Sequence, residues 1–136
     1  MPTLERFGVS MADQLLEDFD DLIKKRGYSS RSEAIRDLVR KELVEEEWTD
    51  PEADVIGTVT LVYDHERTGA LTSAQHEHYD EIVCTTHVHV DETNCMEVVV
   101  IRGSSGKVRH IAEGLLSKRG VKHGRLVCTS TGGLPE

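Results

Sequence analysis

The sequence contains no apolar run that could cross a membrane, for which a helix needs about 20 consecutive apolar residues. Its N-terminal end also lacks the basic segment and following apolar segment that mark a secretion signal. The length of 136 residues and the near-average apolar content are typical of one or two small globular domains. We therefore expect a cytoplasmic protein with no membrane partner.

Cysteine is scarce: there are only three, an odd number without the spacing of a disulfide framework, which is typical of a reducing compartment. Cys84 lies an odd number of residues before His87, so on a shared strand the two side chains point to opposite faces. We therefore expect Cys84 and Cys128 to be buried packing residues. Cys95 belongs to a different pattern.

Positive charge is in deficit, with 16 Lys and Arg against 25 Asp and Glu and a formal net charge of −9. This excess of acid argues mildly against nucleic acid as a partner, because phosphate binding usually requires a basic patch. The objection is weak if the basic groups are local. Many of them fall in one short segment, interleaved with acidic residues: Lys24, Lys25, Arg26, Arg31, Arg36, Arg40 and Lys41.

Two histidines and a cysteine form the most informative pattern of the chain. Residues 82–90 and 94–102 read as β-strands joined by a turn at 91–93. His87 and His89, two apart on the first strand, share one face with Cα atoms roughly 6.6–7 Å apart. If His89 pairs with Cys95, the same register places His87 opposite Glu97. Two imidazoles, a thiol and a carboxylate then share one sheet face.

This arrangement predicts a metal site, and His76 in the upstream run 75–78 adds a further candidate ligand. Zinc would accept such donors tetrahedrally, whereas nickel(II) or copper(II) would take them in planar geometry. Glu97 is a candidate acceptor for an imidazole N–H. The alternatives are an ordinary polar strand face, a buried apolar cysteine and an exposed carboxylate at Glu97.

The first fifty residues predict a strand followed by two helices. Residues 6–11 alternate, with Phe7, Val9 and Met11 on one face. A lone strand leaves its backbone groups unpaired, so a second copy of the chain is the simplest partner. Helices are expected over 12–26, ended by Gly27, and over 30–47. Ser30 and Glu33 form a capping box that opens the second helix. This is the layout of a ribbon-helix-helix domain over residues 1–50.

The remaining residues, 51–136, alternate between strand and helix patterns. Strands are expected over 55–63, 82–90, 94–102 and 124–129, and helices over 72–79 and 104–119. The order β-α-β-β-α-β is that of the ferredoxin-like (ACT-type) fold. The expected fold class is therefore α+β in two domains.

Several segments together resemble the NikR family of nickel-responsive transcriptional regulators. The resemblance is carried by Arg26-Gly27-Tyr28, the run 31–37 (RSEAIRD), 62–66 (VYDHE), Gln75-His76, His87-Val88-His89 with Cys95, and 119–124 (RGVKHG). It implies a homotetramer, a dimer of dimers, that binds one Ni(II) per subunit. His87, His89 and Cys95 of one subunit and His76 of another would be the ligands.

The resemblance also implies how DNA is bound. Two N-terminal strands would form a ribbon in the major groove of a pseudo-palindromic operator, with Arg6 and Ser10 reading bases. Gly8 departs from the family pattern, in which a polar side chain is usual at this position. Arg31 would contact a phosphate near the N-terminus of the second helix.

A possible second cation site is implied at Glu33 and Asp37, one helical turn apart, between the two domains. A solvated acidic face is the alternative. For His65, His78, His110 and His123, we expect surface or locally hydrogen-bonded histidines rather than extra low-affinity metal ligands.

We therefore expect a nickel-responsive DNA-binding repressor that regulates nickel uptake. The alternatives are a metal carrier or storage protein and an antitoxin-like ribbon-helix-helix repressor that does not sense nickel. An enzyme is not expected, because four protein ligands leave a planar ion no open in-plane position and no nucleophile–base pair stands out.

Overall fold

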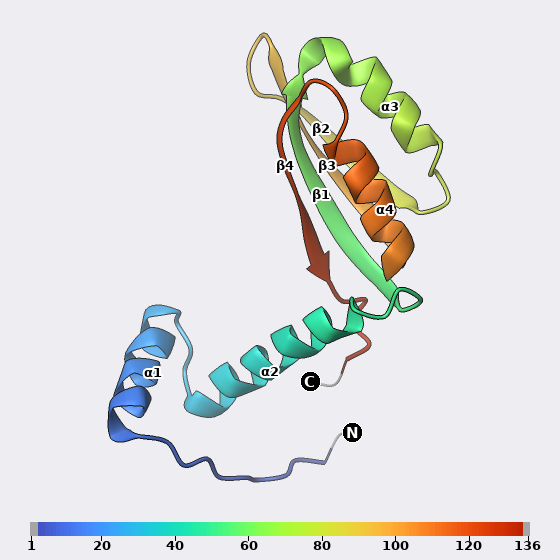
Figure 1. Cartoon of the computed structure of the whole chain (residues 1–136). Coiled ribbons are helices and arrows are strands. Elements are labelled where there is room, and N and C mark those ends of the chain that lie inside the picture. The colour runs from blue at the N-terminus through green and yellow to red at the C-terminus, as the bar shows by residue number, and fades with distance from the viewer. Residues whose placement is uncertain (1–2, 135–136) are drawn as a thin grey trace. The chain divides into compact units, whose positions relative to one another are not determined.

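The computed structural model describes residues 3–134, which form two compact units that divide between Val39 and Arg40. No helix in the described part of the chain is long and apolar enough to cross a membrane. Figure 1 labels the helices and strands, which in chain order are α1 (Asp13–Lys25), α2 (Arg31–Glu47), β1 (Asp54–Asp64), α3 (Thr68–His76), β2 (Ile82–His89), β3 (Asn94–Ser104), α4 (Ser105–Leu116) and β4 (Val121–Thr129). A short 3-10 turn, η1 (His65–Arg67), lies between β1 and α3.

The first unit contains an extended N-terminal segment, α1 and the first part of α2. Residues 3–12 are not assigned as a strand in the single chain, in contrast to the prediction for residues 6–11. The physical reason is that a strand needs a hydrogen-bonded neighbour, and none of residues 3–134 supplies one. The apolar side chains of this segment are exposed, including 75% of Phe7 and 61% of Val9.

The helix boundaries of the first unit follow local signals. Gly27, with φ of +82°, ends α1 in the left-handed conformation that favours glycine. At the start of α2, the Ser30 hydroxyl accepts a hydrogen bond from the Glu33 N–H at 3.1 Å. The carboxylate of Glu33 accepts from the N–H and hydroxyl of Ser29, at 3.2 and 2.5 Å, rather than from the N–H of Ser30. One of the two predicted capping-box hydrogen bonds is therefore present, and in the other Ser29 replaces Ser30 as the donor.

The second unit is a four-stranded antiparallel sheet in the order β2-β3-β1-β4, with α3 and α4 packed on one face (Figure 1). The β-α-β-β-α-β order confirms the predicted ferredoxin-like fold. Alternate residues of β1 and β3 are buried on the helix-covered face, as the period of two in a strand requires. The fully buried core includes Val55, Val59, Leu61, Tyr63, Leu71, Val99, Ile101, Val108, Ile111 and Leu115.

The division between the two units lies inside α2, between Val39 and Arg40. The domain boundary predicted from the sequence was between residues 50 and 51. Trp48, directly after α2, belongs to the core of the second unit, and Val44 packs against that core. The last turns of the helix therefore pack with the sheet domain.

Several element boundaries predicted from the sequence were wrong: the starts of α3 and β4 are earlier, and α3 and α4 end at His76 and Leu116 instead of residues 79 and 119. Helix α3 begins at Thr68 instead of residue 72, after a 3-10 turn in which the Asp64 carboxylate accepts the Glu66 N–H at 3.0 Å. Strand β4 begins at Val121 instead of 124, so Gly124 lies within it. A Cβ at Gly124 would lie 2.4 Å from Leu116 Cδ2 and 2.9 Å from the Thr60 carbonyl oxygen. Glycine is there for close packing and does not mark a strand end.

The prediction for Cys84 was also wrong, since its side chain is exposed. Strand β2 is an edge strand, and its residues from Val83 onward are exposed in the single chain. Cys128 is half-buried, and burial raises the pKa of its thiol, in keeping with a packing role.

The β2–β3 hairpin has the predicted register, with His89 paired to Cys95 and His87 to Glu97. Its turn is held by Asp91, whose carboxylate accepts hydrogen bonds from the backbone N–H groups of Thr93 (2.9 Å) and Asn94 (2.8 Å). The hydrogen bond from the Asn94 side chain, together with these backbone bonds, lowers the pKa of Asp91 to about 2. The ionised form of Asp91 therefore stabilises the hairpin.

Replacing Asp91 with Ala should lower the stability of the protein in a pH-dependent manner. The folded-state pKa of Asp91 is below its unfolded value, so its contribution is complete above the unfolded pKa and is lost as pH falls toward about 2. Chemical denaturation of metal-free wild type and Asp91→Ala between pH 6 and pH 3 should give a difference that shrinks below about pH 4. A difference that is constant over this range would show that the carboxylate does not act through its charge.

Candidate metal centre and nucleic-acid surface

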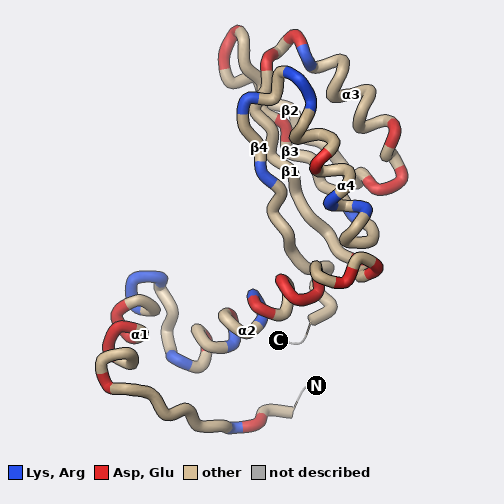
Figure 2. Tube along the Cα trace, viewed as in Figure 1, with Lys and Arg blue, Asp and Glu red and all other residues tan. Residues whose placement is uncertain are grey.

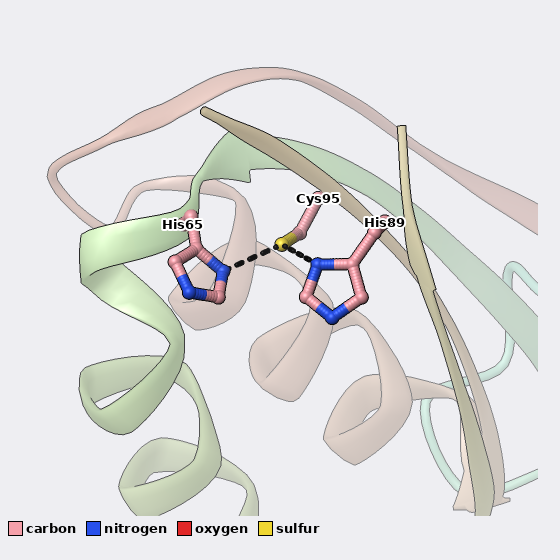
Figure 3. Close-up of side chains that lie close together, drawn as sticks. All are labelled: His65, His89 and Cys95. Atoms are coloured by element: carbon pink, nitrogen blue, oxygen red, sulfur yellow. Dashed lines mark hydrogen bonds between the residues drawn. The ribbon is translucent and has the colours of Figure 1, made fainter. Parts of the chain in front are cut away.

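Three side chains from three elements converge at one end of the sheet. His65 from η1, His89 from β2 and Cys95 from β3 point toward one another (Figure 3), and one donor atom of each lies within 4.8 Å of the others. The Cys95 sulfur is 3.2 Å from His65 Nδ1 and 3.6 Å from His89 Nδ1. Cys95 is buried, whereas both imidazoles are exposed.

These separations fit donors around one ion. With a metal–sulfur bond near 2.3 Å and a metal–nitrogen bond near 2.05 Å, the N···S distance is about 3.1 Å at a right angle and about 3.6 Å at the tetrahedral angle. The two observed distances lie within this range. Imidazole and thiolate donors suit zinc, nickel(II) and copper(II) better than magnesium or calcium. The residues present therefore fit a late transition-metal ion.

Strand pairing explains why these residues meet. The hairpin places His89 opposite Cys95, and β1 pairs with β3 so that Tyr63 is also opposite Cys95. His65 follows Tyr63 by two residues, and its N–H donates to the Thr93 carbonyl in the hairpin turn at 2.8 Å. The end of β1 is thereby attached to the turn between β2 and β3. The β1–β3 register is the signal that could have found His65, which was expected to be an ordinary surface or locally hydrogen-bonded histidine.

His87 lies next to the cluster, on the same face of β2, with its ring centroid 5.1 Å from that of His89. Its Nδ1 is 3.1 Å from Glu97 Oε1 and 3.0 Å from the Tyr63 hydroxyl. A protonated Nδ1 satisfies both contacts, which leaves Nε2 with a free lone pair. Among the described residues, however, the donors close to Cys95 are His65 and His89. His87, which was expected there, is not one of them.

Glu97 is buried, with 3% of its surface exposed, and three neighbours bind its carboxylate. It accepts hydrogen bonds from the Tyr63 hydroxyl at 2.8 Å and from the Gln75 amide at 2.6 Å, beside the contact with His87. Burial and the carboxylate of Glu97 raise the pKa of Tyr63, so the phenol stays protonated and remains a donor. Glu97 is thus placed to accept a hydrogen bond from the His87 imidazole. It is not the exposed strand carboxylate that was the alternative.

His76, the last residue of α3, lies outside the cluster in the single chain. It is exposed and lines a surface pocket of about 210 Å³ together with Gln75 and Tyr79. Its neighbour Gln75 is bound to Glu97 and also accepts a hydrogen bond from the Thr85 hydroxyl at 2.9 Å. The position of His76 is thus connected through Gln75 to the carboxylate that contacts His87.

The other histidines form no donor cluster of three or more within residues 3–134. The rings of His78 and His110 are 6.4 Å apart, and both line a pocket of about 190 Å³ between α3 and α4. His123 is exposed on β4.

The residues expected to contact DNA lie around one groove of the first unit. Arg6, Ser10, Arg31 and Arg36 line a groove of about 740 Å³, whose apolar wall contains Leu4, Phe7, Val9, Met11, Leu16, Phe19 and Ile35. Figure 2 shows basic residues at the end of α1 and along α2, despite the acidic total. Arg31 is paired with Asp20 of α1 through two contacts of 2.8 Å.

Glu33 and Asp37, the possible second cation site, already bind other groups in the first unit. The hydrogen bonds from Ser29 lower the pKa of Glu33, and the Tyr28 hydroxyl donates to Asp37. Both carboxylates are therefore held by local donors from the loop before α2.

Two family models match the two halves of the chain. Residues 5–46 match the family described as ribbon-helix-helix protein, copG family, and residues 56–129 match the family described as NikR C terminal nickel binding domain. One solved structure, an uncharacterized protein from Thermotoga maritima, covers 55% of this chain and 96% of its own, with a TM-score of 0.49 and 14% identity.

Relatives match over nearly the whole chain. A protein of Geobacter sp. (strain M21) is 54% identical over 130 residues, which cover 93% of this chain and 94% of its own. One from Solibacter usitatus is 53% identical and covers 97% of each, and one from Thermococcus onnurineus is 52% identical and covers 95% and 96%. All three have the provisional name nickel-responsive regulator.

The matched families and relatives define a transcription regulator, and not an enzyme, that joins a ribbon-helix-helix unit to a nickel-binding domain. The chain belongs to the NikR family of nickel-responsive regulators.

Glu97→Gln tests the buried carboxylate. An amide in place of one oxygen would face a hydrogen-bond donor, so the acceptor for His87 would be lost or misaligned. If His87 is a ligand, as the sequence predicts, we expect a loss of nickel affinity of roughly 10- to 100-fold, the usual effect of removing the hydrogen-bond partner of a metal-binding histidine. Competition titration with a chelator measures it, with Glu92→Gln in the exposed turn as the control. An unchanged affinity in folded Glu97→Gln would contradict a role in orienting His87.

Proposed function

We propose that this protein is a nickel-sensing transcriptional repressor of the cytoplasm, in which Ni(II) binding to the ferredoxin-like domain raises affinity for a DNA operator. The convergence of imidazole and thiol donors at Cys95, inside the segment that matches a nickel-binding domain, carries the proposal. The assembly would be a homotetramer, a dimer of dimers, with one Ni(II) per subunit. The regulated genes would be those of nickel uptake.

His87, His89 and Cys95 of one subunit and His76 of another would hold the nickel in a planar site. The position of His76, exposed at the end of α3, supports a role across a subunit boundary. His65 contacts the Cys95 sulfur in this structure, so His65 and His87 are alternative third donors. A cysteine binds a metal as the thiolate and a histidine as the neutral imidazole. Protonation of either group competes with the metal, so affinity should fall in acid.

DNA recognition would require two copies of the chain. The exposed apolar residues of the N-terminal segment leave water if a second copy pairs with it as a two-stranded ribbon. Arg6 and Ser10 would then read bases in the major groove, and the two-fold symmetry of the ribbon would match a pseudo-palindromic operator. Arg31 would break its ion pair with Asp20 and bind a DNA phosphate instead.

Nickel and DNA would be linked through thermodynamics. If nickel binds the DNA-competent arrangement of the protein more tightly than its other arrangements, nickel raises operator affinity. DNA then raises nickel affinity by the same factor. A second cation at Glu33 and Asp37 would support this arrangement if it replaced the Ser29 and Tyr28 donors that these carboxylates now bind.

Titration of DNA from upstream of the protein's own gene, with and without stoichiometric Ni(II) at fixed salt, tests the proposal. We expect a large nickel-dependent gain in the wild type and no gain in His89→Ala, which should remain a folded tetramer. His65→Ala and His87→Ala, measured beside it, identify the third donor. Because phosphate contacts depend on ionic strength, the salt concentration must be constant throughout.

Two results would support the alternatives. Tight operator binding that ignores nickel would indicate a ribbon-helix-helix repressor of the antitoxin type. Nickel binding without specific DNA binding in any condition would indicate a metal carrier or storage protein.

Arg6→Ala should weaken binding to the operator far more than binding to unrelated DNA. One bidentate arginine–guanine contact contributes about 1–3 kcal/mol of discrimination against the wrong base. Arg26→Ala removes the same charge from the exposed end of α1 and is the matched control. An equal loss of affinity on operator and unrelated DNA in Arg6→Ala would mean that Arg6 contacts only phosphate.

A further inference from the structure

Trp48, the single tryptophan of the chain, directly follows α2 and is 97% buried, with 3% of its surface exposed. Its backbone N–H donates to the Val44 carbonyl at 3.2 Å, which continues the helical turn. Its indole Nε1 donates to the carbonyl of Thr129, the last residue of β4, at 2.9 Å. The end of α2 is therefore hydrogen-bonded to the far end of the sheet domain's last strand.

The indole ring is enclosed by two other elements of the same unit. A Cβ at Gly57 of β1 would lie 3.1 Å from Trp48 Cη2, so this glycine leaves room for the ring. Arg109 of α4 places its guanidinium carbon 5.3 Å from the ring centroid, a cation–π geometry. Strands β1 and β4 and helix α4 together form the seat of the tryptophan.

The residues after Trp48 are also fixed. The Ser105 hydroxyl donates to the Asp50 carbonyl at 2.5 Å, and the N–H groups of Gly106 and Ser105 donate to the carbonyls of Pro51 (3.0 Å) and Ala53 (2.9 Å). The first amides of α4 are thus satisfied by the connection between α2 and β1. This connection is an ordered part of the sheet domain and does not behave as a free linker.

Helix α2 consequently has residues in both units. Its first part, Arg31–Val39, contains Arg31, Glu33 and Asp37, and its second part, from Arg40 onward, packs with the sheet domain. The chain connects the sheet domain, which contains His65, His89 and Cys95, to the DNA-binding unit through α2. Contacts of Trp48 with β4 and α4 hold the end of this helix in the sheet domain.

We propose that Trp48 is a positioning residue that fixes α2 to the regulatory domain, so that nickel acts on DNA affinity through the helix itself. This inference rests on the nickel-linked DNA binding proposed above. It requires that loosening either the anchor or the helix reduces the linkage while the metal site and the DNA-binding residues remain intact.

The first test is a thermodynamic cycle on Trp48→Ala and Trp48→Phe in the full-length protein. We expect Trp48→Ala to reduce the nickel-dependent gain in operator affinity by about tenfold or more, within the usual range of coupling between sites. Nickel affinity without DNA, and DNA affinity without nickel, should each change much less. Trp48→Phe keeps a ring in the seat and should retain most of the gain. Val99→Ala, a cavity in the same core away from α2, is the matched control.

A second pair of variants loosens the helix without touching the core, in case Trp48→Ala does not fold. Glu42 and Glu45 are exposed on the second part of α2. The double change to Gly lowers helix propensity, whereas the double change to Ala removes the same charges and favours helix. We expect the Gly variant to lose the linkage and the Ala variant to keep it. Emission from Trp48 should be unchanged in both metal-free variants, which shows that the seat is intact.

Retention of the full nickel-dependent gain in Trp48→Ala, or in the Gly variant, overturns the inference while leaving nickel sensing in place. Loss of the gain in Val99→Ala to the same extent also overturns it, because the effect would then belong to the core in general. A wild-type protein with no nickel-dependent gain overturns the proposed function itself, and that result is seen before any variant is made.

Discussion

The register of the β2–β3 hairpin is the constraint on which the metal-binding half depends. It places His89 opposite Cys95 and His87 opposite Glu97, so all four side chains share one face. A slip of one residue would move the two histidines to the opposite face of the strand. The Asp91 turn fixes this register from within the hairpin, and the hydrogen bond from His65 to Thr93 attaches β1 to the same turn.

The buried carboxylate of Glu97 connects His87, which lies beside the donor cluster, to the rest of the domain. It draws together donors from β1, α3 and β2, and its neighbour Tyr63 remains protonated because of burial and the nearby charge. A buried carboxylate is stable only when its oxygens are satisfied in this way. His87 and the last turn of α3 are therefore oriented by one charge, although they are about a dozen residues apart in sequence.

Local and periodic features could be predicted from the sequence. The apolar spacing predicted the helices, the period of two predicted the strands, and the short turn determined the hairpin register. Features that depend on long-range pairing could not be predicted in this way. His65 reaches Cys95 because β1 pairs with β3, and the Glu97 carboxylate accepts a hydrogen bond from Gln75 of α3, which lies 22 residues earlier in the chain. Gly124 resembled a strand end because its close contacts with Leu116 and Thr60 are absent from the local sequence.

The extended segment at residues 3–12 has no strand partner within residues 3–134 of one chain. Any sheet pairing that it makes must therefore be intermolecular, and its population follows the law of mass action. Dilution would deplete the paired form of this segment while the hydrogen bonds of the four-stranded sheet, which lie within one chain, are unaffected by it. Pairing of this segment therefore depends on the concentration of the protein, whereas the pairing of the strands in the sheet domain does not.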